Sequence, residues 1–284
     1  MGRFTIAVMR TDGFILRESA GVPYYICSAL AQDISIRHGF STRHGGVSLA
    51  PDRILNLGYV PWDSHDNVRE NRRRFLSALG LAPDCLATAA QAHSTEVHII
   101  IGGAHQWNPN TRGDALVTAE SGVALAIQVA DCFPVLISDS KTGTIAAAHA
   151  GWRGALARIL PQTLAGMKHK LGVDPTHVLV AIGPGIRNCC LEVGSDVADA
   201  FEAAFPRARL CSPHPNHRGK RLLDMPKALT LQLAEAGVPR EAVYDLGLCT
   251  RCHADEFFSH RAEGSGAGRM MGVICRMSGL SNST

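Results

Sequence analysis

Four short apolar runs, each flanked by turn or polar residues, are the feature that most restricts the fold of this chain. Runs of this length and composition are typical of buried β-strands. Asp131 and Cys132 separate the first two runs, and glycines follow the last two. The sequence therefore predicts a largely buried sheet whose strands lie at 123–129, 134–138, 144–148 and 178–182.

Helical segments alternate with these strands. The helices are expected at 63–79, 156–171, 195–205 and 224–236, where Asp63 or Ser64 and Asp224 can act as N-caps and Pro161 limits where the second helix begins. The segment 206–220 contains three prolines and is expected to be an exposed loop. The alternation predicts a single layered domain of the α/β or α+β class, although strand order cannot be predicted.

Composition excludes several classes of protein. With 284 residues, 46% hydrophobic and 19% charged, the chain can bury a core and is not disordered. A net charge of +3 is too small to indicate nucleic acid or an anionic membrane as a partner. No apolar stretch reaches membrane-spanning length, and the apolar run 6–9 is too short for a secretory signal. Without an export signal, the nine cysteines are expected to be reduced thiols or metal ligands in the cytoplasm.

Polar residues that interrupt buried strands are the strongest candidates for chemistry. Cys132 lies between two apolar strands, and His149 ends the next one. If the intervening residues form neighbouring strands, the two side chains emerge at the same end of the sheet. His93 follows another apolar stretch and could join them. Two imidazoles and a thiolate form a catalytic zinc site with an open fourth position, whereas a Cys–His nucleophile pair or three buried core residues are the alternatives.

Three other patterns are weaker. Cys249 and Cys252 have the spacing of zinc ligands, but only His260 is nearby in the sequence, so two ordinary thiols are the simpler interpretation. The glycine-rich segment 182–188 could bind an anion or form a plain turn. The arginine run at 69–74 is expected to be a solvated helix face.

Motifs in register from about residue 38 to residue 275 resemble the YfiH family, also called the laccase-domain or multicopper polyphenol oxidase family and regarded as purine nucleoside phosphorylases. The motifs are His-Gly-Phe-Ser-Thr-Arg-His-Gly-Gly-Val-Ser (38–48), Asn-Leu-Gly (56–58), Asn-Arg (71–72), Gln-Ala-His-Ser (91–94), Gly-Asp-Ala-Leu-Val-Thr (113–118), Ala-Asp-Cys-Phe-Pro-Val-Leu (130–136), His-Ala-Gly-Trp-Arg-Gly (149–154), Ile-Gly-Pro (182–184), Leu-Glu-Val-Gly (191–194), Cys-Thr (249–250), Phe-Phe-Ser-His-Arg (257–261) and Gly-Arg-Met (268–270). The resemblance implies a mixed central sheet in a catalytic domain over 38–284. Residues 1–37 are then an N-terminal extension that packs on this domain.

The resemblance also implies a zinc site on His93, Cys132 and His149, with copper as a possible substitute, and a purine nucleoside pocket. It suggests that Arg43, Arg261 and Arg269 bind phosphate, ribose or base. The family usually has tyrosine at two positions that are Leu191 and His260 in this chain, and these changes lie where substrate preference would be set.

Three further residues receive expected roles. Trp152 could stack on a purine or serve in packing, Arg153 could join the phosphate clamp, and Asp131 could orient the site or shuttle a proton, as an alternative to a structural capping role. The activity implied is phosphorolysis of adenosine, inosine or S-methyl-5′-thioadenosine, with deamination of adenosine. The expected partners are a purine nucleoside and phosphate, and the chain is expected to be a monomer or homodimer.

Three rival functions remain. A phenol oxidase with several copper sites usually contains His-x-His pairs, and none occurs among the thirteen histidines. A zinc-independent cysteine hydrolase could use Cys132 as the nucleophile and His149 as the base on an amide of a cell-wall precursor. A metal-binding regulatory module would bind zinc without turning over nucleosides.

Overall fold

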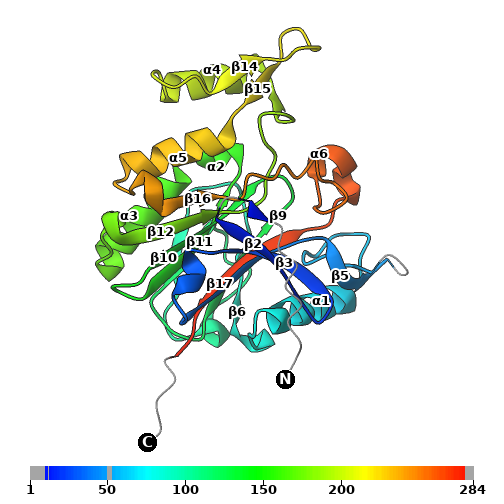
Figure 1. The fold of residues 1–284 in the computed structure, drawn as a ribbon, viewed down its shortest axis with the longest axis vertical. Coiled ribbons are helices and arrows are strands. Elements are labelled where there is room, and N and C mark those ends of the chain that lie inside the picture. Colours follow the sequence, from blue (N-terminus) through cyan, green and yellow to red (C-terminus); the bar gives the residue numbers. More distant parts are fainter. Residues whose placement is uncertain (1–9, 12, 50–52, 279–284) are drawn as a thin grey trace, which may run out of the picture.

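Two large sheets pack face to face in the structure, a computed structural model that describes residues 10–11, 13–49 and 53–278 (Figure 1). The first sheet is antiparallel apart from the β6–β9 pair. Its strands, in spatial order, are β1 (Arg10–Thr11), β2 (Phe14–Ser19), β3 (Val22–Cys27), β4 (Ile36–Ser41), β17 (Met270–Arg276), β9 (Ala124–Val129) and β6 (Leu86–Ala87). The described part of the N-terminal segment thus extends this sheet through β2 and β3.

The second sheet is mixed, as the sequence resemblance implies. Strands β12–β16 and β7–β8 pair in parallel, and the other neighbours are antiparallel. Its order is β16 (Val243–Asp245), β12 (Val178–Ile182), β10 (Phe133–Asp139), β11 (Thr144–Ala150), β8 (Ala115–Thr118) and β7 (Val97–Ile99). All four predicted strands are present, so the predicted α/β class is confirmed.

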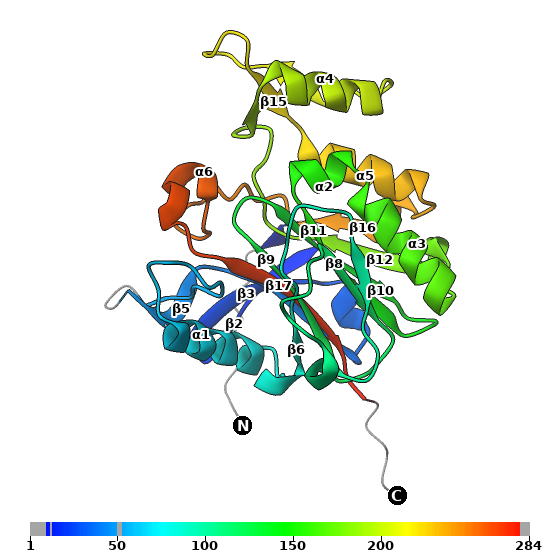
Figure 2. The same cartoon turned by 180° about the vertical axis from the view of Figure 1, so that it is seen from behind.

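Alternating side chains give each sheet two buried faces. In β10, Leu136 packs in the cluster between the two sheets with Ile127 and Ile274 of the first sheet. Its neighbour Val135 points to the opposite face, where it packs in the same cluster as Leu164 of a covering helix. Helices cover the outer faces of both sheets, which gives four layers (Figure 2).

The helices are capped largely as predicted. Ser64 accepts the N–H of Asn67 at the start of the first helix, and Asp224 accepts the N–H of Lys227 at the start of the fifth. The bounds are α1 (His65–Ala78), α2 (Trp152–Leu156), α3 (Ile159–Leu171), α4 (Ser195–Ala204), α5 (Met225–Glu235) and α6 (His260–Glu263), with 3-10 turns η1 (Leu30–Gln32), η2 (Pro83–Cys85), η3 (Ala104–Gln106), η4 (Pro175–His177), η5 (Arg240–Ala242) and η6 (Gly264–Gly266).

Two local expectations were wrong in detail. The helix expected from residue 156 begins at Ile159, because Arg158 has a φ of 72° and Pro161 could not continue the ladder of a preceding helix. The expected loop 206–220 contains β14 (Cys211–Pro213), which pairs with β15 (Arg221–Leu223). With β13 (Glu192–Val193) these strands and α4 form a small lobe above α2 and α5. In the described ranges, no helix combines the length and apolar character needed to cross a membrane.

Candidate metal centre

A cavity of about 850 Å³ opens where β9, β10 and β11 meet α2 and α6. Its wall includes Val129 at the end of β9, Phe133 at the start of β10 and Ala150 at the end of β11. Trp152 and Arg261, from the starts of α2 and α6, also line it. The volume is within the range that small-molecule sites usually occupy.

The β10–β11 hairpin brings Cys132 and His149 together at this cavity. Pro134 pairs with His149 and Phe133 with Ala150, so Cys132, one residue before β10, lies beside the end of β11. This is the juxtaposition expected from two short neighbouring strands. His149 is buried and Cys132 is half-buried.

His93 reaches the same point from the segment before β7. Its Nε2 lies 3.8 Å from Sγ of Cys132, and its ring meets that of His149 edge-on with centroids 4.8 Å apart. One donor atom from each of the three side chains lies within 4.8 Å of the others. The structure therefore places the three residues predicted as ligands at a single point.

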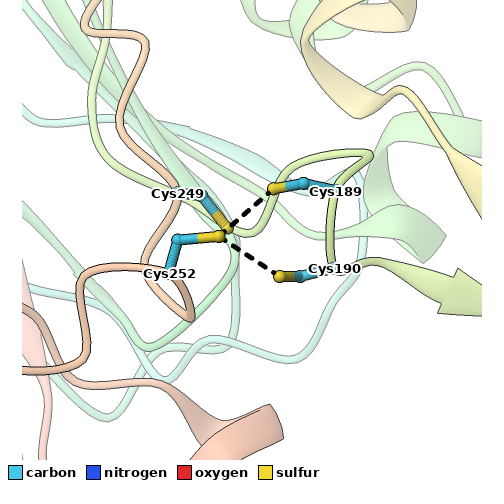
Figure 3. A group of neighbouring side chains, drawn as sticks. All are labelled: Cys189, Cys190, Cys249 and Cys252. Carbon is cyan, nitrogen blue, oxygen red and sulfur yellow. Dashed lines mark hydrogen bonds between the residues drawn. The ribbon is translucent and has the colours of Figure 1, made fainter.

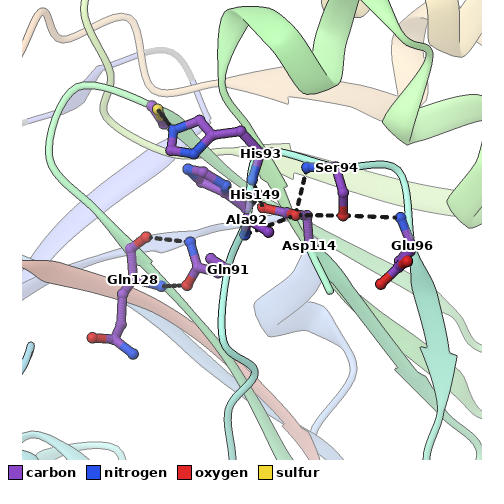
Figure 4. Close-up of polar contacts among 9 residues, drawn as sticks. Gln91, Ala92, His93, Ser94, Glu96, Asp114, Gln128 and His149 are labelled. Atoms are coloured by element: carbon purple, nitrogen blue, oxygen red, sulfur yellow. Dashed lines mark hydrogen bonds and ion pairs between the residues drawn. The ribbon is translucent and has the colours of Figure 1, made fainter. Parts of the chain in front are cut away.

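The side chain of Gln91 holds the segment that carries His93. It donates to the carbonyl of Gln128 at 2.7 Å and accepts the N–H of Gln128 at 2.8 Å, as a neighbouring strand would (Figure 4). His93 itself has a φ of 56°, a conformation that few residues other than glycine adopt. Such backbone strain is common at functional sites, where surrounding contacts must maintain it.

Asp114 organises the ligands, a role that was not predicted from the sequence. Its buried carboxylate accepts Nδ1 of His149 at 2.8 Å and the N–H groups of residues 92, 93 and 94, as Figure 4 shows. Because Nδ1 is engaged, Nε2 of His149 is the nitrogen that faces the site. A carboxylate behind a ligating histidine is the usual support of a metal-bound imidazole.

Charges within the cluster determine its protonation. Burial alone would raise the pKa of the Cys132 thiol, but the adjacent imidazoles of His149 and His93 lower it to about 6. Burial alone would lower the pKa of His149, but the Cys132 sulfur and the Asp114 carboxylate raise it to about 9. Hydrogen bonds from His149 and Ser94 outweigh burial and hold the pKa of Asp114 well below its usual value. The cluster therefore favours a thiolate, the form that binds metals.

The cluster also has the packing of a site shaped around its donors. A Cβ at Gly151 would lie 2.9 Å from Cδ2 of His93 and 3.0 Å from Sγ of Cys132, so only glycine leaves both side chains in place. Two imidazoles and a thiolate are donors that zinc and copper accept. The residues present fit a single metal ion.

Asp131, next to Cys132, also has a strained backbone, with a φ of 83°. Its carboxylate accepts Oγ1 of Thr250 at 2.7 Å and the N–H of Arg261 at 2.6 Å. Its carbonyl accepts the N–H of Ile186 at 2.8 Å. These contacts join three separate segments around the cavity.

Arginines dominate the charge of the cavity. Arg153, Arg261 and Arg269, all expected at the site, line it, and the Arg153 guanidinium lies 4.4 Å from the centre of the Trp152 ring. Burial lowers the pKa of Arg269. Among the described residues that line the cavity, Asp131 is the single carboxylate, so the cavity favours an anion.

Arg72 is a fourth arginine that lines the cavity, so the expectation that the whole run 69–74 forms a solvated face was wrong for this residue. Arg69 and Arg73 do form exposed ion pairs, with Asp66 and Glu70. Arg72 instead donates to the carbonyl of Leu57 at 2.8 Å and lies over the ring of Tyr59. The family motif Asn-Arg at 71–72 was the sequence feature that could have indicated a place for Arg72 in the cavity.

Arg43, expected to bind substrate, does not line the cavity. Its guanidinium donates to Glu263 at 2.6 Å and to the carbonyl of Ala254 at 2.5 Å, and it stacks on Phe258. The two positions that depart from the family pattern, Leu191 and His260, both line the cavity.

Comparisons with known proteins agree with this fold and site. The family model described as "Multi-copper polyphenol oxidoreductase laccase" matches residues 37–277. The chain is 40% identical over 249 residues to a Deinococcus radiodurans protein named purine nucleoside phosphorylase, covering 86% of this chain and 90% of that one. A Bacteroides thetaiotaomicron protein of the same name is 36% identical over 254 residues, with 87% and 93% covered. The crystal structure of YlmD from Geobacillus stearothermophilus superposes with a TM-score of 0.81 at 32% identity, covering 92% and 98%.

The chain therefore belongs to the laccase-domain family, whose YfiH-type members its motifs resemble. The names of its relatives support an enzyme. The family description suggests a metal, and the described residues include groups that could hold one.

Proposed function

We propose that this chain is a zinc-dependent purine nucleoside phosphorylase that acts on adenosine, inosine and S-methyl-5′-thioadenosine and also deaminates adenosine. The observation that carries the proposal is the convergence of His93, Cys132 and His149 on one wall of a cavity lined by arginines. The names of the relatives support the reaction class.

His93, Cys132 and His149 would hold the zinc. When bound, zinc supplies a Lewis acid with an open coordination position. Asp114 keeps His149 in the tautomer that presents Nε2. The same donors also suit copper, so the identity of the bound metal must be determined before activity is assayed.

The arginines would bind the phosphate nucleophile. In phosphorolysis a phosphate oxygen forms a bond to C1′ of the ribose, the C–N bond breaks, and the purine leaves with the electron pair and takes up a proton. Arg72, Arg261 and Arg269 can offset the phosphate charge in a site partly shielded from water. Trp152, half-buried at the cavity edge, would stack on the purine, and Arg153 would extend the clamp.

Two residues expected at the site are better suited to positioning. Both carboxylate oxygens of Asp131 are engaged by Thr250 and Arg261, so Asp131 would fix the backbone of Arg261 rather than carry protons. Arg43 would hold the segment 254–263, which includes α6. Strands β2 and β3 support an N-terminal extension over 1–37 that packs on a catalytic domain at 38–284.

A product assay tests the proposal. Purified protein of known metal content is incubated with adenosine or inosine, with and without phosphate. Adenine or hypoxanthine that appears only with phosphate reports phosphorolysis, and ammonia with inosine reports deamination. Full turnover and full zinc content in Cys132→Ala or His149→Ala would refute the proposed site.

A cysteine hydrolase is the second candidate, because Asp114, His149 and Cys132 are arranged as a base and nucleophile with an orienting carboxylate. In a metal-free protein this arrangement would allow Cys132 to react rapidly with iodoacetamide. Zinc bound at the three donors would block that reaction, and removal of the metal would restore it. Rapid alkylation of the protein as purified, with no zinc present, would favour the hydrolase.

A further inference from the structure

Four cysteines outside the candidate active site converge at one point. Cys189 and Cys190 follow β12, whereas Cys249 and Cys252 follow β16 (Figure 3). Sγ of Cys252 lies 3.5 Å from that of Cys189 and 3.4 Å from that of Cys190. All four sulfurs lie within 4.8 Å of one another.

The pairing of two strands causes this convergence. Strands β12 and β16 are parallel neighbours, with Ile182 opposite Asp245, so the segments that follow them leave the sheet at the same end. A bridge between Gly185 and Cys249 continues the pairing beyond the strands. The Cys-x-x-Cys pair can be recognised in the sequence, and the pairing of β12 with β16 brings the other two thiols beside it.

We propose that Cys189, Cys190, Cys249 and Cys252 bind a second, structural zinc ion. Zinc bound tetrahedrally by four thiolates at about 2.3 Å separates the sulfurs by about 3.8 Å. The observed separations of 3.4 Å and 3.5 Å are close to this value. They are far longer than the roughly 2.0 Å bond of a disulfide. Four soft donors with no open position form a closed structural site, which differs from the three-donor cluster of the cavity.

The backbone around the thiols suits thiolate ligands. The N–H of Arg187 points to Sγ of Cys249 at 3.5 Å. The N–H of His253 donates to the carbonyl of Cys249 at 3.0 Å and closes a tight turn around Cys252. The N–H of Cys190 donates to the carbonyl of Arg187 at 2.8 Å, which closes the turn on the other side. Both turns present their sulfurs inward.

The ion would link two chain segments that contribute residues to the cavity. The segment 183–191 carries Ile186 and Leu191, which line the cavity. The segment 246–261 carries Thr250, which holds the Asp131 carboxylate, and Arg261, whose N–H does the same. Both segments are largely irregular, and backbone hydrogen bonds join them at Gly185, which bonds to Leu248 and Thr250. The metal would add a second link between the two segments beside this bridge.

Metal content and thiol reactivity test the site in the wild-type holoenzyme. We expect at least two zinc ions per chain when the protein is purified with reductant. Cys189 and Cys252 are exposed, so they should react with a thiol reagent within minutes if free. Bound to zinc, they should stay protected until a chelator removes the metal. Rapid reaction of these two thiols before chelation, or a disulfide within the cluster, would overturn the proposal.

Single substitutions separate the two sites. Cys252→Ser should lose one zinc per chain relative to wild type, whereas Cys211→Ser, a partly exposed cysteine outside both clusters, should lose none. His149→Ala should lose a different ion and retain the one bound by four thiols. In the cobalt-substituted protein, the strong thiolate-to-cobalt charge transfer should persist in His149→Ala and fall by more than half in Cys252→Ser. Equal zinc content and equal spectra in Cys252→Ser and Cys211→Ser would refute the second site, whatever the outcome for His149→Ala.

Discussion

The Asp114 carboxylate accepts a hydrogen bond from Nδ1 of His149 at 2.8 Å and thereby fixes which imidazole nitrogen faces the cavity. An asparagine at this position carries no charge and would present either a weaker acceptor or a competing donor. We expect Asp114→Asn to weaken metal binding by about 10- to 100-fold, the usual effect of losing such a partner. Competition with a chromogenic chelator measures the change.

Asp139 provides the matched control for this substitution. It is also a buried aspartate in the second sheet, at the far end of β10, where it accepts the N–H of Lys141 and the hydroxyl of Thr142. Asp139→Asn should reduce stability but leave metal affinity unchanged. Equal metal affinity in Asp114→Asn and wild type would show that Asp114 does not support the site.

Gly151 should be required for its lack of a side chain rather than for its backbone conformation. Its φ of −78° suits any residue, but an added Cβ would lie 2.9 Å from the His93 ring and 3.0 Å from the Cys132 sulfur. Gly151→Ala should displace both donors and lower turnover by roughly 100-fold, as a shift of about 1 Å in reacting groups can do. Initial rates at saturating substrate measure this effect.

Gly166→Ala is the control at a spacious position. It lies inside α3, and its Cβ would meet Val97 at 3.4 Å, an ordinary contact. Because glycine weakens a helix interior, this substitution should stabilise the protein by about 0.5–1 kcal/mol in urea unfolding and leave turnover unchanged. A comparable loss of turnover in both variants would show that the Gly151 effect is not steric.

The convergence of Cys132 and His149 could be predicted because it depends on local geometry. Two strands of seven residues joined by a short turn place residues 132 and 149 at the same end of a hairpin. His93 could be added because it also follows an apolar stretch. The strands and the helix caps were predictable for the same reason, since each depends on neighbouring residues.

Contacts that depend on strand order could not be predicted from spacing. Asp114 directly precedes β8, which pairs with β11, and its carboxylate accepts backbone hydrogen bonds from a third segment. The four cysteines meet because β12 and β16 are neighbours, although about sixty residues separate the two pairs. The environment of Arg72 differs from that of Arg73 because Tyr59 and Leu57 lie against one side of α1. The spacing of the arginines in the sequence gives no information about this packing.

Arg72 should contribute to anion binding, whereas Arg73, its neighbour on α1, should not. Arg72 lines the cavity, and Arg73 is exposed and paired with Glu70. A charged hydrogen bond to phosphate is worth about 1.5–3 kcal/mol. Arg72→Met should therefore raise the apparent KM for phosphate by about 10- to 100-fold, and Arg73→Met should leave it within about twofold. Initial rates over a range of phosphate concentrations distinguish the two, and identical KM values would remove Arg72 from the binding site.

His38 should make the stability of the fold depend on pH between about 4 and 6.5. Its imidazole is 4% exposed, and Nε2 accepts the N–H of Cys27 at 2.9 Å. Burial lowers the pKa of His38 from 6.5 to about 4, so the folded protein keeps it neutral. Between pH 6.5 and pH 4 the unfolded chain binds a proton at this imidazole and the folded chain does not. The unfolding free energy must therefore fall as the pH drops from 6.5 towards 4.

A pKa shift of this size lowers the unfolding free energy by about 3 kcal/mol at pH 4. Above pH 7 the imidazole is neutral in both the folded and the unfolded chain, so the shift has no effect on stability there. His38→Gln keeps an acceptor for Cys27 and removes the titration, so its unfolding free energy should vary less with pH between 4 and 6.5. His169→Gln, at an exposed position on α3, should retain the wild-type slope. Urea unfolding at pH 4.5, 5.5 and 7 measures the three slopes. Parallel curves for wild type and His38→Gln would mean that another buried group causes the loss of stability in acid.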